Sequence, residues 1–151
     1  MFHIALWEPE IPPNTGNVAR LCAATGAVLH LVGRLGFRTD DRSLKRGGLD
    51  YWNAVTVRYH TTFAELEAEV GPDHIWCVET PSAVPYTRAA FRPGDCLVFG
   101  SESKGLPATV RERYAPRTIG IPMPTGAVRS LNLATAAGIV LYEALRQTND
   151  W

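Results

Sequence analysis

The sequence predicts an α/β fold with a mainly parallel, six-stranded sheet flanked by helices. Short apolar segments alternate with longer segments of helical periodicity from one end of the chain to the other, and this alternation is typical of parallel sheets. No internal repeat, low-complexity tract or long polar linker divides the pattern. We therefore expect residues 1–151 to form a single domain.

The six predicted strands are the short apolar segments. Turn residues or helix candidates follow each of them, as strand-to-helix connections require. In chain order, the predicted strands are His3–Trp7, Val28–Val32, Ala54–Tyr59, Ile75–Glu79, Cys96–Phe99 and Thr118–Ile121. We expect them to pair in one sheet.

The predicted helices lie between these strands and after the last of them. They are Asn17–Thr25, a segment near Arg42–Leu49, Phe63–Val70, Ala108–Tyr114 and Leu131–Gln147. Thr62 followed by Glu65 has the spacing of a capping box, and Gly26 and Gly71 each follow a predicted helix. Pro107 suits a first helical position. These end signals support the alternating pattern.

Composition is that of a soluble globular protein. Of the 151 residues, 46% are hydrophobic and 20% are charged. No apolar segment approaches the roughly 20 residues that span a bilayer. The N-terminal segment has no basic stretch, and Glu8 and Glu10 interrupt its apolar character, so it does not resemble a secretory signal. We therefore expect a cytoplasmic protein with no membrane association.

The cysteines and histidines predict neither disulfides nor a metal site. Cys22, Cys77 and Cys96 are an odd number of cysteines, and each lies in an apolar segment, which is typical of buried free thiols. The histidines share no ligand spacing and lie beside predicted strands, so structural roles are favoured over metal binding or catalysis. They are His3, His30, His60 and His74.

The last predicted helix is apolar or small on nearly all sides, so it should pack against two partners. Either it is a central core helix, or it covers the sheet with one face and a second subunit with the other. The first predicted helix is similar, with Arg20 as its single charge. The stripe on the last helix is Leu133, Ala137, Val140, Leu141, Ala144 and Leu145, and Ala134, Gly138, Ile139 and Tyr142 lie off it.

The first of three glycine-rich segments is residues 14–20, NTGNVAR. It connects the first strand to the first helix, and therefore places amide groups and a guanidinium at the carboxyl end of a strand, where open α/β sheets bind ligands. The alternative is a plain helix cap with a surface arginine, because asparagine and glycine are ordinary turn residues.

The second segment is residues 97–107, LVFGSESKGLP, which runs from a strand through a turn into a helix. Its two glycines allow a ligand close to the backbone. It is not a phosphate-binding P-loop, because Leu106 and Pro107 stand where Lys and Ser or Thr would be required. Glu102 suits a cationic or hydroxyl-bearing ligand better than a phosphate. The alternative is a purely structural turn.

The third segment is residues 119–133, IGIPMPTGAVRSLNL, which leads into the last helix. Its prolines stiffen the loop and leave backbone groups free, and its apolar residues could form a wall for a purine ring. Ser130 is the predicted N-cap of the last helix. The alternative is a loop and a helix cap without a ligand.

Taken together and in this order, the three segments resemble the motifs of the SPOUT methyltransferases, specifically the tRNA wobble-position 2'-O-methyltransferases of the TrmL (YibK-like) type. The resemblance covers nearly the whole chain and is most specific in WEPEIPPNTGNVARLCAATG, LVFGSESKGLP and IPMPTGAVRSLNLATA. The stretch GFRTDDRSLKRGGLDYW is also similar to the corresponding family segment, whereas the loop Pro124–Arg129 is slightly longer than the family pattern.

This resemblance implies that the protein transfers a methyl group from S-adenosylmethionine to the ribose 2'-hydroxyl of the wobble cytidine or modified uridine of tRNA. The product of the cofactor would be S-adenosylhomocysteine, and no metal would be needed. The resemblance further implies the SPOUT fold, with a deep C-terminal trefoil knot that holds the cofactor, and a homodimer formed through the first and last helices. Periodicity alone does not suggest a knot, since knots are essentially absent among proteins.

The resemblance also implies site residues. The catalytic set would be Arg20, with Asn14 and Asn17 beside it and Asn132 facing the reaction centre. A guanidinium cannot readily accept a proton. We therefore expect Arg20 to hold the neighbouring phosphate and lower the hydroxyl's pKa, while a phosphate oxygen or water takes the proton. The cofactor would lie against Val78, Glu79, Thr80, Gly100, Glu102, Gly105, Ile119, Ile121, Met123, Ser130, Leu131 and Ala134.

The formal net charge is zero, so an RNA site has to be a local basic patch. Basic residues gather beside aromatic ones after the second strand, as binding of a single-stranded anticodon loop requires. The alternative is a solvated charged loop balanced by Asp40, Asp41 and Asp50. The predicted RNA-binding residues are Arg34, Arg38, Arg42, Lys45, Arg46, Lys104 and Arg129, with Phe37, Tyr51 and Trp52 as stacking surfaces.

Two other functions fit the same sequence. One is 2'-O-methylation of a different ribose in tRNA or rRNA, and the other is a non-catalytic RNA-binding dimer with the same fold. The absence of an additional RNA-binding domain favours the wobble-position enzyme over the first, and the presence of both the arginine segment and the cofactor segments favours an enzyme over the second.

Overall fold

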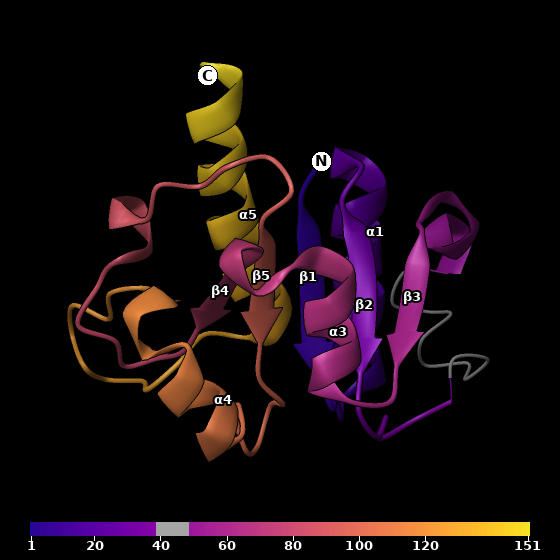
Figure 1. Ribbon diagram of the computed structural model, residues 1–151, viewed down its shortest axis with the longest axis horizontal. Coiled ribbons are helices and arrows are strands. Elements are labelled where there is room, and N and C mark those ends of the chain that lie inside the picture. Colours follow the sequence, from indigo (N-terminus) through magenta and orange to yellow (C-terminus); the bar gives the residue numbers. More distant parts are fainter. Residues whose placement is uncertain (39–48) are drawn as a thin grey trace.

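The computed structural model describes residues 1–38 and 49–151, and these form the expected parallel α/β sheet (Figure 1). Strand order in the described part is β3-β2-β1-β5-β4-β6, and every pairing is parallel. The strands are β1 (His3–Trp7), β2 (Val28–Val32), β3 (Val57–His60), β4 (Ile75–Val78), β5 (Cys96–Phe99) and β6 (Thr118–Ile119). The helices are α1 (Pro12–Thr25), α3 (Phe63–Val70), α4 (Ala108–Arg113) and α5 (Leu133–Asn149), with 3-10 helices η1 (Leu49–Ala54), η2 (Pro72–His74), η3 (Tyr86–Arg88) and η4 (Ala115–Arg117).

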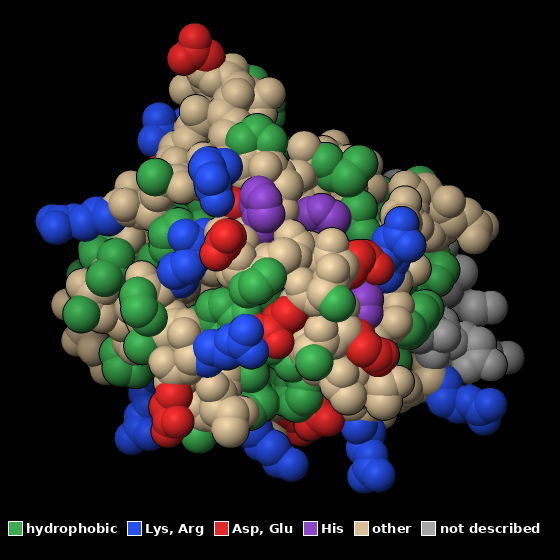
Figure 2. All heavy atoms as spheres, viewed as in Figure 1, with side chains coloured by type: hydrophobic (Ala, Val, Ile, Leu, Met, Phe, Trp, Pro, Cys, Tyr) green, Lys and Arg blue, Asp and Glu red, His purple; other side chains and the backbone are tan. Residues whose placement is uncertain are grey.

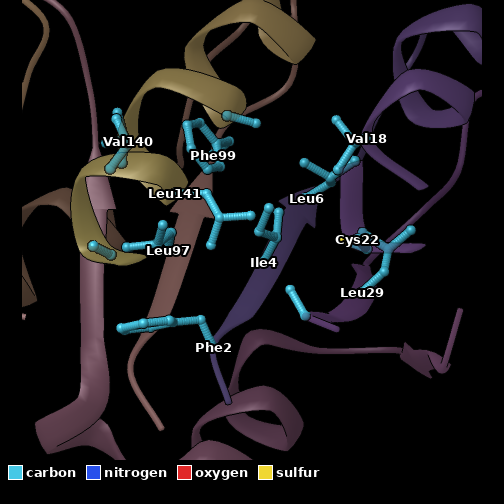
Figure 3. Close-up of a cluster of buried hydrophobic side chains, with 14 of the residues drawn as sticks. Phe2, Ile4, Leu6, Val18, Cys22, Leu29, Leu97, Phe99, Val140 and Leu141 are labelled. Atoms are coloured by element: carbon cyan, nitrogen blue, oxygen red, sulfur yellow. The ribbon is translucent and has the colours of Figure 1, made fainter. Parts of the chain in front are cut away.

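The sheet is covered on both faces, as parallel sheets require. Helices α1 and α5 pack on one face around Ile4, Leu29 and Leu97, and Figure 3 shows the side chains that meet there. Helices α3 and α4 pack on the other face around residues such as Cys77 and Val98. Alternate residues of a strand therefore enter different cores, because successive side chains point to opposite faces of a sheet.

Strands β1, β2 and β5 and helix α3 have the predicted bounds, and the capping box before α3 is confirmed. The Thr62 hydroxyl accepts the N–H of Glu65 at 3.3 Å, and the Glu65 carboxylate accepts the N–H of Thr61. Gly26 ends α1 in the left-handed region with φ +78°, as its position after the helix predicted.

Several predicted boundaries were wrong. Helix α1 begins at Pro12 instead of Asn17, because prolines are tolerated in a first turn, whose N–H groups have no helical partner. The N-cap of α5 is Asn132 and not Ser130, and Pro107 is the N-cap of α4 instead of its first residue. The predicted strand Ala54–Tyr59 starts three residues late, at Val57, because η1 occupies residues 49–54. The predicted helix near Arg42–Leu49 lies outside the described residues except for Leu49.

The remaining elements end one or two residues away from their predictions. Strand β4 stops at Val78 and β6 at Ile119, while α4 stops at Arg113 and α5 continues to Asn149. Within the described residues, no helix is both long and apolar enough to cross a membrane. The cysteines are buried free thiols as predicted, and burial raises the pKa of Cys22 and of Cys77 to about 12.

Leu141 of α5 is fully buried in the core between α5 and the sheet. We expect Leu141→Ala to lower the free energy of unfolding by about 2–5 kcal/mol, because the substitution leaves a cavity in a close-packed core. Urea denaturation at fixed protein concentration measures the change. Thr109→Ala, at an exposed position of α4, is the control and should change stability by less than about 0.5 kcal/mol. A similar loss in both variants would contradict the packing of Leu141.

Candidate active site

A cavity of about 580 Å³ lies at the carboxyl ends of β1, β4 and β5. This is the size range of pockets for small organic ligands. In the sheet order, β1 and β5 are neighbours. The connection after β1 leads to β2 on one side of this pair, and the connection after β5 leads to β6 on the other side. Open α/β sheets bind ligands at such a switch point, because the loops on either side separate there. The cavity wall consists of residues 78–80, 99–102, 104–105 and 130–133 together with Ile11, Asn14, Ile121, Met123 and Ala136.

The Glu102 carboxylate connects the first and second glycine-rich segments. One oxygen accepts the N–H of Glu10 at 2.9 Å, and the other accepts the N–H of Ile11 at 2.9 Å and the side-chain amide of Asn14 at 3.2 Å. A helix N-terminus has unsatisfied N–H groups and a positive partial charge, so a carboxylate is stabilised there. Glu102 lines the cavity, but its oxygens already bind the start of α1.

A second pair of residues reinforces this connection. The Glu10 carboxylate accepts both the N–H and the hydroxyl of Ser103, at 2.9 and 2.6 Å. These bonds from Ser103 lower the pKa of Glu10. Glu10 and Ser103 are 93 residues apart, and no pattern in the sequence indicated that they meet.

Asn14 and Asn132 extend the connection to the third segment. The Asn132 side-chain amide donates to the Asn14 side-chain oxygen at 2.9 Å, while the Asn132 oxygen caps α5 by accepting the N–H groups of Ala134 and Thr135. One continuous hydrogen-bonded chain therefore runs from Glu102 through Asn14 to Asn132. It joins all three segments at the cavity.

The turn after β5 is unusually tight. A Cβ atom on Gly100 would lie 2.3 Å from the backbone carbon of Gly105 and 2.5 Å from the nitrogen of Leu106. Ser101 and Gly105 exchange backbone hydrogen bonds across the turn. The Glu79 carboxylate accepts the N–H of Leu106 at 2.8 Å and so holds the turn against the end of β4.

Before it reaches the cavity, the third segment pairs with β4 and is hydrogen-bonded to the loop that follows β4. Strand β6 pairs with β4, and the next residue, Gly120, exchanges backbone hydrogen bonds with Val84 and Tyr86. A Cβ atom on Gly120 would come within 2.7 Å of the Glu79 carbonyl oxygen. The chain at Gly120 therefore passes closely between β4 and the loop that follows β4.

Ten of the twelve predicted cofactor-binding residues line the cavity, and two do not. Ile119 is wholly buried beneath it in the core. Ala134 borders a neighbouring groove instead. The residues of the wall that the sequence did not predict for a ligand are Ile11, Phe99, Ser101, Leu133 and Ala136.

The predicted catalytic residues are divided between the cavity and that groove. The groove is shallow, and Arg20 and Asn17 of α1 border it together with Asn132, Ala134 and Thr135. Asn14 lies in the cavity wall, and Asn132 borders both spaces. Arg20 is exposed, so a large substrate in the groove can reach it.

Of the predicted RNA-binding residues that the structure describes, one lines the cavity and three are exposed on loops. Lys104 lines the cavity and is exposed, and Arg34, Arg38 and Arg129 are exposed on loops. Arg42, Lys45 and Arg46 lie outside the described residues, as does the side chain of Tyr51.

The two described aromatic residues of the predicted patch are half-buried. Trp52, one of the predicted stacking surfaces, packs part of its side chain against the core around α1. Figure 2 shows basic and acidic side chains mixed over the face that it presents, in agreement with the zero net charge.

Comparison with known proteins was consistent with this arrangement. The sequence model of the SpoU rRNA Methylase family matches residues 1–142. A tRNA (cytidine(34)-2'-O)-methyltransferase of Escherichia coli (strain K12) is 46% identical over 150 residues, which cover 97% of this chain and 94% of that protein. The enzyme of the same description from Methylovorus glucosotrophus is 43% identical over 97% of this chain and 96% of its own length.

Solved structures also match nearly the whole of this chain. One described as "Structural insights into the 2-OH methylation of C/U34 on tRNA" superposes with a TM-score of 0.91 at 47% identity, and covers 100% of this chain and 98% of that one. The SpoU methyltransferase AviRb from Streptomyces viridochromogenes, solved in complex with AdoMet, gives a TM-score of 0.85 at 25% identity, over 97% of this chain and 57% of its own.

Gly100→Ala should lower the free energy of unfolding by at least about 1–3 kcal/mol, because the added Cβ would meet backbone atoms that cannot move aside. Gly26→Ala is the control: its Cβ would meet nothing within 4 Å, and only its positive φ carries a cost. Urea denaturation compares the two variants. An equal or smaller loss for Gly100→Ala would argue against the tight turn.

Proposed function

Because this chain belongs to the SpoU rRNA Methylase family, we propose that it is a tRNA (cytidine(34)-2'-O)-methyltransferase. It transfers a methyl group from S-adenosylmethionine to the ribose 2'-hydroxyl of cytidine or modified uridine at wobble position 34. The observation that supports this best is that relatives of this description match 97% of the chain, while the family model spans every segment that forms the cavity.

The residues of the cavity fit S-adenosylmethionine. Ile121, Met123 and Leu131 offer an apolar wall for the adenine ring, and Glu79 and Glu102 place negative charge near a cationic ligand. S-adenosylmethionine supplies a methyl group already activated by a positively charged sulfur, so no metal is required. We propose that the ten predicted residues that line the cavity bind the cofactor, with Ile119 supporting the wall from beneath.

Arg20 and its neighbours are proposed to position the nucleotide. Asn132 borders both the cavity and the groove, so a ribose held there would face the cavity while its phosphate reaches Arg20. A guanidinium binds a phosphate through two parallel hydrogen bonds and stays protonated. Arg20 therefore aligns the nucleotide and stabilises the developing alkoxide, and a phosphate oxygen or water accepts the proton. Alignment of this kind can supply several kcal/mol.

The anticodon stem-loop is the proposed substrate region. Lys104 and Arg129 lie on loops beside the cavity, and the loop after β2 carries Arg34 and Arg38. The C-terminal trefoil knot also remains a proposal. It is supported by the close passage of the chain at Gly120 between β4 and the loop that follows β4.

The proposed homodimer uses α1 and α5. Four residues of α5 are buried against its own sheet, namely Ala137, Val140, Leu141 and Ala144. On other sides of α5, Gly138 and Ile139 are only half-buried and Tyr142 is 46% exposed. These residues offer a second subunit an apolar surface.

Mapping of 2'-O-methyl groups in tRNA from a deletion strain tests the function, and Arg20→Lys tests the mechanism. The deletion should remove the mark at position 34. In vitro, Arg20→Lys should retain affinity for S-adenosylmethionine but lose at least about tenfold in methyl transfer, because lysine cannot form the paired hydrogen bonds to phosphate. Calorimetry and tritium transfer from labelled cofactor measure the two effects.

Arg111→Lys, at an exposed position of α4, is the matched control and should be fully active. Near-normal turnover of Arg20→Lys across the pH range would contradict the proposed role. Loss of a mark at another ribose would support the different-site enzyme, and tRNA binding without any methyl transfer would support the non-catalytic binder.

Gly138→Ala tests the dimer. A Cβ on Gly138 meets nothing within 4 Å in the single chain, and alanine favours a helix interior by about 1 kcal/mol over glycine. The substitution should therefore leave the protomer's fold intact while weakening dimerisation, because in the proposed dimer the added methyl group would keep a partner helix from approaching this side of α5. Analytical ultracentrifugation over a dilution series measures the dimer. An unchanged dissociation constant would place the interface elsewhere.

A further inference from the structure

Three histidines form a row across the face of the sheet that α3 covers. His3 lies on β1, His30 on β2 and His60 on β3. The strand register pairs His3 with Val28 and Val32 with His60, so the three side chains point to the same face, each two residues further along than the last. Ring nitrogens of neighbouring histidines are 2.9 Å apart at both steps. Sequence spacing did not indicate this row, because its members come from three separate strands.

Helix α3 adds a carboxylate at one end of the row. A Glu69 oxygen lies 3.6 Å from Nδ1 of His30, the same nitrogen that faces His60. One donor atom each from His30, His60 and Glu69 lie within 4.8 Å of one another. His30 is fully buried, whereas the Glu69 side chain is 36% exposed, so the group can be reached from solvent on one side. Figure 2 shows histidine side chains at the surface of this face, beside acidic and basic ones.

Two imidazole nitrogens and one carboxylate oxygen are a donor set of zinc and similar transition-metal ions. In a tetrahedral zinc site the metal–nitrogen distance is about 2.0–2.1 Å, so two ligand nitrogens lie roughly 3.3 Å apart. The 2.9 Å between His30 and His60 is close to this separation, and a small opening would admit an ion. An exposed fourth position would remain for water.

The surroundings of these three groups also resemble those of a metal site. Histidine ligands usually place their second ring nitrogen against another polar group, which fixes the orientation of the ring. The second nitrogen of His30 contacts His3 at 2.9 Å. Arg58 contacts the Glu69 carboxylate at 3.2 Å. The Arg58 side chain is 53% exposed, so it can turn into solvent and leave the carboxylate to an ion.

We propose that His30, His60 and Glu69 form a binding site for one transition-metal dication such as Zn²⁺, with His3 as the outer partner of His30. None of these residues lines the cavity or the groove of the methyl-transfer site. The ion would connect the edge strand β3 and helix α3 to the buried strand β2. Its role would therefore be to stabilise this side of the sheet, and the methyl transfer would not depend on it.

The test uses the full-length protein after removal of metals with a chelator. Calorimetry should detect one Zn²⁺ per protomer, bound Zn²⁺ should raise the melting temperature, and Co²⁺ should give the visible absorption of a tetrahedral site. His60→Gln and Glu69→Gln should each weaken Zn²⁺ binding by at least about tenfold. Both positions are at least partly exposed, so these variants should fold. The cysteines are all buried and should not compete for the ion.

Glu112→Gln removes an exposed carboxylate from α4 and is the matched control, which should bind Zn²⁺ like the unaltered protein. Glu69→Gln should also retain methyl transfer to tRNA, so the outcome is independent of the proposed function. If Zn²⁺ does not bind, or binds equally to all four proteins, the histidines are only a hydrogen-bonded row and the proposal is overturned.

Discussion

The structure depends on one partly buried hydrogen-bonded chain, in which the Glu102 carboxylate accepts the side-chain amide of Asn14 and the Asn14 oxygen accepts that of Asn132. Glu102 and Asn132 each have a second structural role. Glu102 satisfies the first N–H groups before α1, and Asn132 caps α5. Because unpaired polar groups at a helix end or in a pocket wall are costly, the three segments are stable only in this mutual arrangement. The cavity is the space that this arrangement leaves.

Close backbone approach decides the shape of that cavity. Gly100 and Gly120 each lie where a Cβ atom would come within 3 Å of another backbone atom. At both places two segments of chain pass one another without room for a side chain. Rigid walls follow from this packing, and a rigid wall positions a ligand at little entropic cost at the moment of binding. For a methyl transfer, which needs alignment more than acid or base chemistry, such a wall is well suited.

The sheet carries two polar clusters, one at the carboxyl ends of its strands and one on the face that α3 covers. At the carboxyl ends of the strands, polar groups line an open cavity, as is usual for parallel α/β proteins. Under α3, the histidine row replaces apolar packing within the sheet itself, with His30 fully buried. A buried imidazole needs partners for both of its nitrogens, and the row provides them from the neighbouring strands.

The sequence by itself determined the fold class, the place of most strands and the three segments that form the cavity wall, because these follow from local periodicity, turn residues and recognisable motifs. It did not determine that Asn132 caps α5, that Glu10 meets Ser103, or that His3, His30 and His60 lie in one row. Such contacts join residues far apart along the chain. Only the strand order and register of the tertiary structure bring them together, since local propensity carries no information about which distant strand becomes a neighbour.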